Sequence, residues 1–238
     1  MISRKFNVRP QRFASKIAAA VSKAHIAIVE NWFDALADVM WGSQCPVCAK
    51  PGADMCQSCW PIPAPHRLQF NDRLLQIAFA EAPIAACRYD SSFRFLISAI
   101  KEQGRHDLAP IVAELSSVAF SQLTEIPTGT VLVPIPSRWL VSQKRGISLP
   151  QELAAALPGN QMNLLRHAHS VRDQAGLSAW ERKRNMSGAF IAKHGSPKNV
   201  IVVDDVCTTG ATLRAAVVAL LKSGHKVHSA VFASSTRV

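Results

Sequence analysis

The 238-residue chain lacks any uncharged apolar stretch of the roughly 18 to 20 residues that span a bilayer, so no transmembrane helix is expected. Aromatic residues are scarce, at 7% of the chain. Acidic residues are also few, with 16 Asp and Glu against 27 Lys and Arg, which leaves a formal net charge of +11. This balance favours an anionic partner, and phosphate esters, nucleic acid and anionic lipid all stay open. Because 48% of the residues are hydrophobic, disorder is not expected.

The N-terminal segment, residues 1–44, lacks acidic residues before Glu30 and is rich in Lys and Arg. Its best apolar stretch, residues 17–29, is interrupted by Lys23 and His25, and no small-residue cleavage site follows, which argues against a secretory peptide. Apolar residues recur at spacings of three to five over residues 17–41, as on one face of a helix. We therefore expect a basic amphipathic helix, with a transit peptide as the alternative.

The rest of the chain divides by composition. Residues 45–60 hold two cysteine pairs and predict a compact metal knuckle, residues 61–80 read as a Pro-rich linker, and residues 81–238 alternate short apolar runs with helical patterns. This alternation predicts an α/β domain with a parallel sheet. Strands are expected at 82–89, 130–135, 199–203 and 226–233, and helices at 93–101, 106–123, 149–157 and 211–223. Residues 166–184 are polar and basic and predict a long loop.

The most informative segment is residues 200–212, in which four β-branched residues precede Asp204 and Asp205. Carboxylates in this place lie at the carboxyl end of a buried strand, where ligands bind in open α/β sheets. Two adjacent acids can accept hydrogen bonds from neighbouring sugar hydroxyls or hold Mg²⁺. A bare pair of acids at a strand end is more often simply solvated, so the residues that follow matter.

A small-residue turn follows the two acids and leads into the helix expected at 211–223. Backbone N–H groups and hydroxyls converge there on the positive end of the helix dipole, where a phosphate binds without a basic side chain. A ligand that offers sugar hydroxyls and a phosphate, and that binds with magnesium, fits a ribose 5-phosphate that carries pyrophosphate. The residues of this expected turn are Cys207, Thr208, Thr209, Gly210, Ala211 and Thr212, and Cys207 is given no nucleophilic role.

A second apolar strand, at residues 131–135, ends in a turn that contains Pro136, Ser137 and Arg138, with Lys144 and Arg145 shortly afterwards. The prolines restrict this loop, and the cations supply charge for a pyrophosphate. Taken alone, the segment fits an edge strand with an ordinary turn and solvated cations equally well.

Residues 200–212 resemble the phosphoribosyl pyrophosphate (PRPP) binding signature of type I phosphoribosyltransferases. Residues 165–190, which include Leu165-Arg166, Gln174 and Gly188-Ala189-Phe190, resemble the flexible-loop region of the ComF family, phosphoribosyltransferase-like proteins linked to DNA uptake in competent bacteria. The cysteine pairs, the stretch from Lys101 to Gly104 and the strand at 131–135 follow in that family's order, so the resemblance covers about residues 40–238. The chain departs from the family pattern at Ile147 to Leu149 and at Val171.

The resemblance implies a type I phosphoribosyltransferase-like fold, with an enzyme that binds PRPP and Mg²⁺ and transfers phosphoribose with release of pyrophosphate. Asp204 and Asp205 would be its catalytic acids, and the loop around Gln174 would close over the ligand. A non-catalytic DNA-binding competence factor that keeps the PRPP site as a sensor is the alternative. Only Trp180 interleaves with the basic residues 166–184, so a platform for single-stranded DNA has little support, although such DNA stays a candidate partner.

Four cysteines are spaced as two Cys-x2-Cys pairs, Cys45 with Cys48 and Cys56 with Cys59. Two such pairs supply the four thiolates of a closed structural zinc site. Zinc is favoured, but iron uses similar spacings, so iron and a bare thiol cluster stay open as alternatives. Paired cysteines without an export signal indicate metal ligation before disulfides, hence a reducing cytoplasm.

Overall fold

The structure is a computed structural model that describes residues 44–52, 54–137, 148–168 and 188–237. The chain divides into two compact units, Met1–Cys56 and Gln57–Val238. In the described ranges, no helix is both long and apolar enough to cross a bilayer. The expected N-terminal helix lies outside the described residues.

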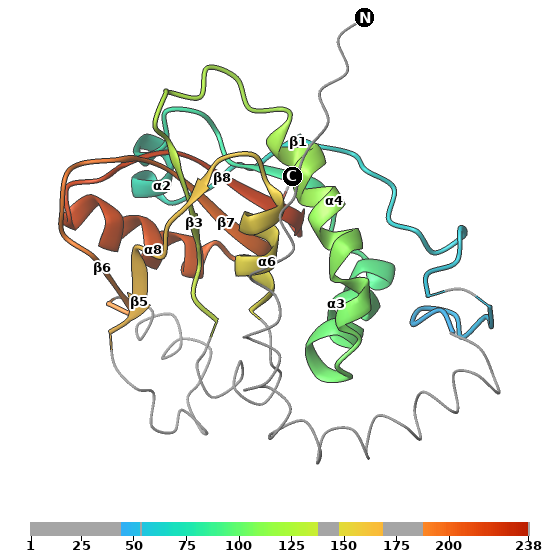
Figure 1. Ribbon diagram of the computed structural model, residues 1–238. Helices are drawn as coiled ribbons and strands as arrows, with labels where there is room; N and C mark the ends of the chain where they lie inside the picture. Colours follow the sequence, from blue (N-terminus) through green and yellow to red (C-terminus); the bar gives the residue numbers. More distant parts are fainter. Residues whose placement is uncertain (1–43, 53, 138–147, 169–187, 238) are drawn as a thin grey trace, which may run out of the picture. The chain divides into compact units, whose positions relative to one another are not determined.

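A six-stranded sheet forms the centre of the larger unit (Figure 1). All neighbouring strands are parallel except β1 and β2, which pair antiparallel. β7 lies inside the sheet between β8 and β3, and its residues 200–203 are fully buried. The spatial order is β1 (His66–Arg67), β2 (Ile84–Arg88), β8 (Lys226–Ser235), β7 (Asn199–Cys207), β3 (Val131–Pro134) and β4 (Asn160–Gln161).

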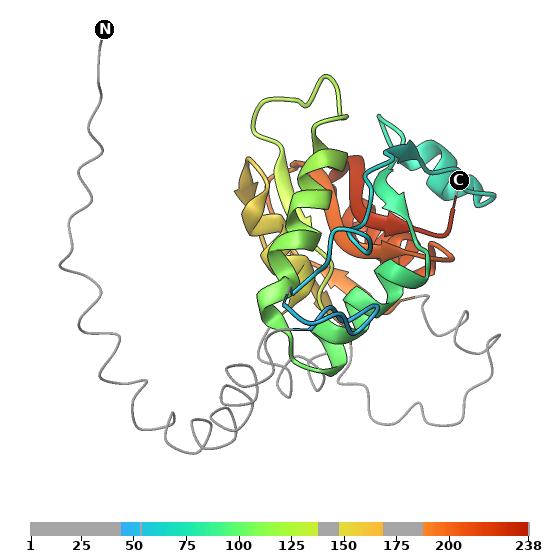
Figure 2. The same cartoon turned by 90° about the vertical axis from the view of Figure 1, so that its right-hand side faces the viewer.

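Helices cover both faces of this sheet (Figures 1 and 2). Val200 and Val202 of β7 belong to the same buried cluster as Leu213 and Leu220 of α8 (Ala211–Lys222). Successive strand residues point to opposite faces, so Ile201 and its alternate neighbours face the other side, against which α6 (Leu149–Ala156) packs. The remaining helical elements are α2 (Arg73–Ala78), α3 (Ser91–Glu102), η1 (His106–Leu108) and α4 (Ala109–Phe120), of which α4 packs on β2 and β8.

A separate two-stranded sheet is formed by β5 (Leu165–His167) and β6 (Phe190–Ala192), which pair antiparallel. The ring of His167 lies 5.1 Å from that of Phe190. Residues 166 and 167 thus belong to a strand, although the polar composition of 166–184 predicted a loop there, because β6 is a partner from beyond residue 187 that the local pattern does not show.

The α/β class with a mostly parallel sheet is confirmed. The four expected strands all form, and β7 runs on to Cys207 because β8 continues beside it, with Asp204 opposite Phe232. The helix expected from residue 106 begins as η1, and α4 starts only at Ala109 with Pro110 in its first turn. Residues 61–80, expected as a linker, hold β1 and also α2, which Asp72 caps by accepting from Leu74 N and Leu75 N.

Candidate functional site at the carboxyl end of the sheet

The two adjacent acids lie near the carboxyl end of β7, where the sequence placed them. Asp205 is 4% exposed, whereas Asp204 is half-buried. Each accepts from a neighbouring backbone N–H: Asp204 Oδ1 from Asp205 N at 2.9 Å, and Asp205 Oδ1 from Val206 N at 2.8 Å. These bonds fix both side chains while leaving acceptor capacity on Asp204.

Lys101, in the last turn of α3, forms an ion pair with Asp205 Oδ2. Burial, followed by the negative charge of Asp205, raises the pKa of Asp204 well above its usual range, and the Lys101 ammonium opposes this shift. The site therefore holds two close carboxylates with one cation beside them. A ligand that brings hydroxyl donors or a divalent cation would relieve the remaining repulsion.

The turn after β7 leads directly into α8. Gly210, at φ 79°, precedes the first residue of α8 and adopts the left-handed conformation that favours glycine. Thr209 Oγ1 accepts from Ala211 N at 3.3 Å. Within the described part of the chain, the backbone N–H groups of Thr208, Thr209 and Thr212 have no acceptor, whereas that of Gly210 donates to the Cys207 thiol. Free N–H groups at a helix N-terminus suit an anion.

Cys207 is buried at the base of this turn. Burial, together with the charge of Asp204, raises the pKa of the Cys207 thiol to about 12. A thiol with this pKa stays protonated near neutrality.

The end of β3 lies beside the end of β7, since Pro134 is in register with Val203 and Ile135 N donates to Val203 O at 3.0 Å. Pro136 and Ser137 follow at this edge. The Ser137 hydroxyl lies 3.2 Å from that of Ser148, and the Ser137 carbonyl lies 3.1 Å from His167 Nε2. The other residues expected to contact pyrophosphate or close over it, Arg138, Lys144, Arg145 and Gln174, lie outside the described residues.

Two residues of this region received no role from the sequence. Lys101 was noted only as part of a family-like stretch, and a lone cation on a helix gives no sign of its partner, which lies 104 positions further along the chain. His167 lies in the polar and basic stretch 166–184, whose pattern predicts a long loop and singles out no residue. Both act through contacts between distant segments, which spacing does not reveal.

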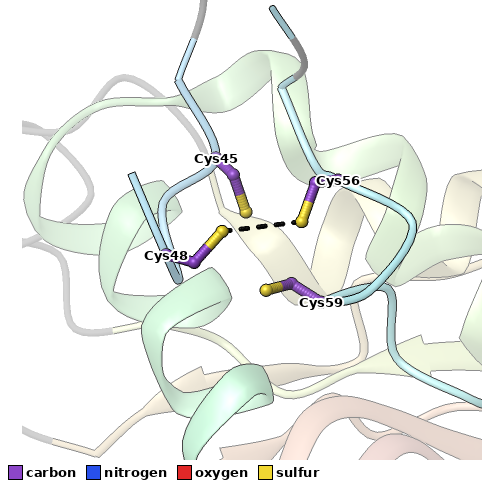
Figure 3. A group of neighbouring side chains, drawn as sticks. All are labelled: Cys45, Cys48, Cys56 and Cys59. Atoms are coloured by element: carbon purple, nitrogen blue, oxygen red, sulfur yellow. Dashed lines mark hydrogen bonds between the residues drawn. The ribbon is translucent and has the colours of Figure 1, made fainter. Parts of the chain in front are cut away.

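The four paired cysteines form a cluster in which all sulfur atoms lie within 4.8 Å of one another (Figure 3). Cys48 Sγ and Cys56 Sγ are 3.6 Å apart, close to the edge of about 3.8 Å that a tetrahedron with Zn–S bonds of about 2.3 Å would have. Although burial opposes it, hydrogen bonds from backbone N–H groups, first that of Cys56, lower the pKa of Cys45 to about 6. A thiol so readily ionised suits a metal ligand, and the cluster can hold a metal ion.

Residues 143–237 match the family model described as the phosphoribosyl transferase domain. This part of the chain is phosphoribosyltransferase-like. The match covers about two fifths of the chain and contains Asp204, Asp205 and the turn that follows them, together with Lys144, Arg145 and Gln174. The comparison with curated proteins gave no significant match.

Two solved structures are similar to the chain. An adenine phosphoribosyltransferase from Leishmania tarentolae matches with a TM-score of 0.33 and 14% identity, over 56% of this chain and 59% of that one. An orotate phosphoribosyltransferase from Aeropyrum pernix matches with a TM-score of 0.32 and 14% identity, over 71% and 88%. The chain thus spans only about three fifths of the first of these proteins, and similarities at this level do not extend to substrate or activity.

Proposed function

We propose that the protein binds PRPP with Mg²⁺ at the carboxyl end of β7 and transfers its phosphoribosyl group to a nucleophile, which makes it a glycosyltransferase of the phosphoribosyltransferase type. One observation carries the proposal: the acid pair at the end of β7 is followed directly by a turn with backbone N–H groups that have no acceptor among the described residues. Both lie within the phosphoribosyltransferase-like region. An acid pair alone is common at strand ends, whereas an acid pair beside an anion cradle suits a phosphorylated sugar.

Each part of the site receives one part of the ligand. The carboxylates of Asp204 and Asp205 accept hydrogen bonds from the ribose hydroxyls. The backbone N–H groups and hydroxyls of the turn from Cys207 to Thr212 bind the 5-phosphate. Pyrophosphate lies toward Pro136, Ser137 and the cations Arg138, Lys144 and Arg145, and the segment around Gln174 closes over the ligand.

In the reaction, the bond between ribose C1 and the pyrophosphate oxygen breaks, and the electron pair of that bond leaves with pyrophosphate. The nucleophile then forms the new bond to C1, and its proton passes to solvent. Positive charge that develops on the ribosyl ring is stabilised by the nearby carboxylates, and the departing charge by the cations of the loop. Mg²⁺ bound with PRPP supplies further charge for the pyrophosphate. No covalent enzyme intermediate is needed.

We further assign the protein to the ComF family, with a role in DNA uptake or nucleotide metabolism. The support is the order of motifs along the chain, in which a cysteine knuckle precedes the phosphoribosyltransferase-like region. Four cysteines that are grouped as metal ligands fit a reducing compartment, so we place the protein in the cytoplasm.

Calorimetric titration of the purified protein with PRPP in the presence of Mg²⁺ tests the proposal. Saturable heat that disappears in Asp205→Asn supports it, and no heat at millimolar ligand overturns it. Single-stranded DNA is titrated in parallel at several salt concentrations. Binding that weakens steeply with log salt, in a protein without PRPP binding, would instead favour the non-catalytic DNA-binding function.

For the cysteine cluster we propose a structural zinc ion held by Cys45, Cys48, Cys56 and Cys59, with the metal ordering residues 42–62. Purified protein should contain one zinc per chain, and X-ray absorption should show sulfur ligands only. Chelation or Cys48→Ser should increase proteolysis in this segment, while Cys87→Ser, at a buried cysteine outside the cluster, should leave the metal content unchanged. A metal-free preparation with equal resistance to protease would overturn the zinc assignment.

A further inference from the structure

The penultimate residue of the chain, Arg237, donates hydrogen bonds to backbone carbonyl groups of the turn that follows β7. Its guanidinium donates from Nε to the Thr208 carbonyl at 2.9 Å and from Nη2 to the Thr209 carbonyl at 2.8 Å. The third nitrogen, Nη1, donates to the Gln69 carbonyl at 3.1 Å. One side chain thereby binds two successive carbonyl groups of the turn and ties them to the segment that precedes α2.

These bonds decide where the turn's N–H groups point. In a trans peptide the C=O of one residue and the N–H of the next belong to one plane and point in opposite directions. Holding the Thr208 and Thr209 carbonyls on the guanidinium therefore turns the N–H groups of Thr209 and Gly210 away from Arg237. The Thr209 N–H has no acceptor among the described residues, and that of Gly210 has only the weak acceptor Cys207 Sγ.

Arg237 is itself held in place. Its guanidinium carbon lies 5.1 Å from the centre of the Phe70 ring, its backbone N–H donates to Ser235 Oγ at 2.9 Å, and its carbonyl lies 2.9 Å from His66 Nε2. The Phe70 ring also supports the turn directly, because a Cβ on Gly210 would lie 2.8 Å from Phe70 Cε1.

We infer that Arg237 is a positioning residue that presents the backbone N–H groups of the turn to a phosphate monoester. This inference rests on the proposed function, since the phosphate it serves is the 5-phosphate of that ligand. The guanidinium also neutralises two carbonyl dipoles that would otherwise lie close to an anion, so the turn can bind phosphate without a basic side chain in contact with it.

The experiment compares Arg237→Met and Arg237→Lys with the control Arg67→Met. Arg67 also bonds to two carbonyls, those of Ala82 and Gln122, and pairs with Glu81, but it lies near the amino end of β2. Both methionine variants should lower the unfolding temperature. Only Arg237→Met should weaken ribose 5-phosphate binding, by tenfold or more, with Arg237→Lys intermediate because an ammonium still donates to a carbonyl.

A second readout does not depend on ligand. Nitrogen-15 relaxation in the unliganded protein should give order parameters of about 0.85 for Thr209 and Gly210 in the wild type and in Arg67→Met, and lower values in Arg237→Met. Unchanged order parameters, or ribose 5-phosphate affinity equal to that of the wild type, would overturn the role of Arg237. A wild type that binds neither ribose 5-phosphate nor PRPP with Mg²⁺ would overturn the proposed function instead, and the relaxation data would still decide whether Arg237 orders the turn.

Discussion

The carboxylates at the two ends of the central sheet differ in how fully they are paired with cations and hydrogen-bond donors. At the amino end, Glu81 accepts from Arg67 at 2.6 Å and from Thr124 N at 3.0 Å, and pairs with His228 at 3.3 Å. At the carboxyl end, Asp204 and Asp205 share one cation, Lys101, and the adjacent turn has N–H groups with no acceptor among the described residues. The amino end is a closed network, whereas the carboxyl end keeps capacity for a ligand.

The pKa values of Glu81 at the amino end and Asp204 at the carboxyl end are shifted in opposite directions. Although burial opposes it, hydrogen bonds from the Thr124 backbone and from Arg67 lower the pKa of Glu81. Burial and a second carboxylate raise the pKa of Asp204. A network that satisfies its charges stabilises the fold, and a group left partly unsatisfied is typical of a functional site.

The largest expected effect is on ligand affinity, which should fall after a substitution at the carboxyl end of the sheet but not after one at the amino end. Asp205→Asn should weaken the binding of PRPP with Mg²⁺ by about a hundredfold or more, because it removes a carboxylate and leaves Lys101 without its partner. Glu81→Gln should leave that affinity within about twofold and lower only the unfolding temperature. Calorimetry and thermal unfolding of both variants measure this, and equal losses of affinity would show that the two ends do not differ in function.

The second prediction concerns two glycines with the same backbone conformation. Gly210 and Gly224 have φ values of 79° and 82°, but a Cβ meets Phe70 only at Gly210 and nothing within 4 Å at Gly224. Gly210→Ala should therefore weaken ribose 5-phosphate binding by tens of fold, while Gly224→Ala should cost about 1 kcal/mol of stability and no affinity. If the two variants bind equally, the close approach of Phe70 does not shape the turn.

The sequence predicted most of the parallel sheet and the acid pair, because both follow from local patterns such as the apolar run before Asp204. It did not predict β1, whose two residues are too short for a pattern, or β5, whose partner β6 lies beyond residue 187. It also missed Lys101 and Arg237. These side chains reach Asp205 and Thr208 only after folding, so no spacing along the chain indicates their roles.

The third prediction tests the cation at the carboxyl end. Lys101→Met removes the charge that opposes the raised pKa of Asp204, so this pKa should rise further. Ligand affinity should fall by about tenfold at pH 7 and recover partly at higher pH, as Asp204 ionises. Lys222→Met is the matched control, since Lys222 also lies in the last turn of a 12-residue helix but is exposed. A pH-independent loss would assign Lys101 a direct contact with ligand instead.

The smallest expected effect is on the pH dependence of stability, which should have opposite signs for Asp204 at the carboxyl end of the sheet and Glu81 at the amino end. Asp204 has a raised pKa, so the folded state holds its proton more tightly, and the stability this contributes is lost as pH rises above the ordinary Asp value of about 3.9. Glu81 has a lowered pKa, so its contribution is present above about 4.3 and is lost as pH falls through the folded value. Relative to wild type, Asp204→Asn should therefore gain stability as pH rises above about 4, and Glu81→Gln should lose stability over the same rise. Urea unfolding at several pH values measures both slopes, and slopes of the same sign would contradict the contrast between the two ends.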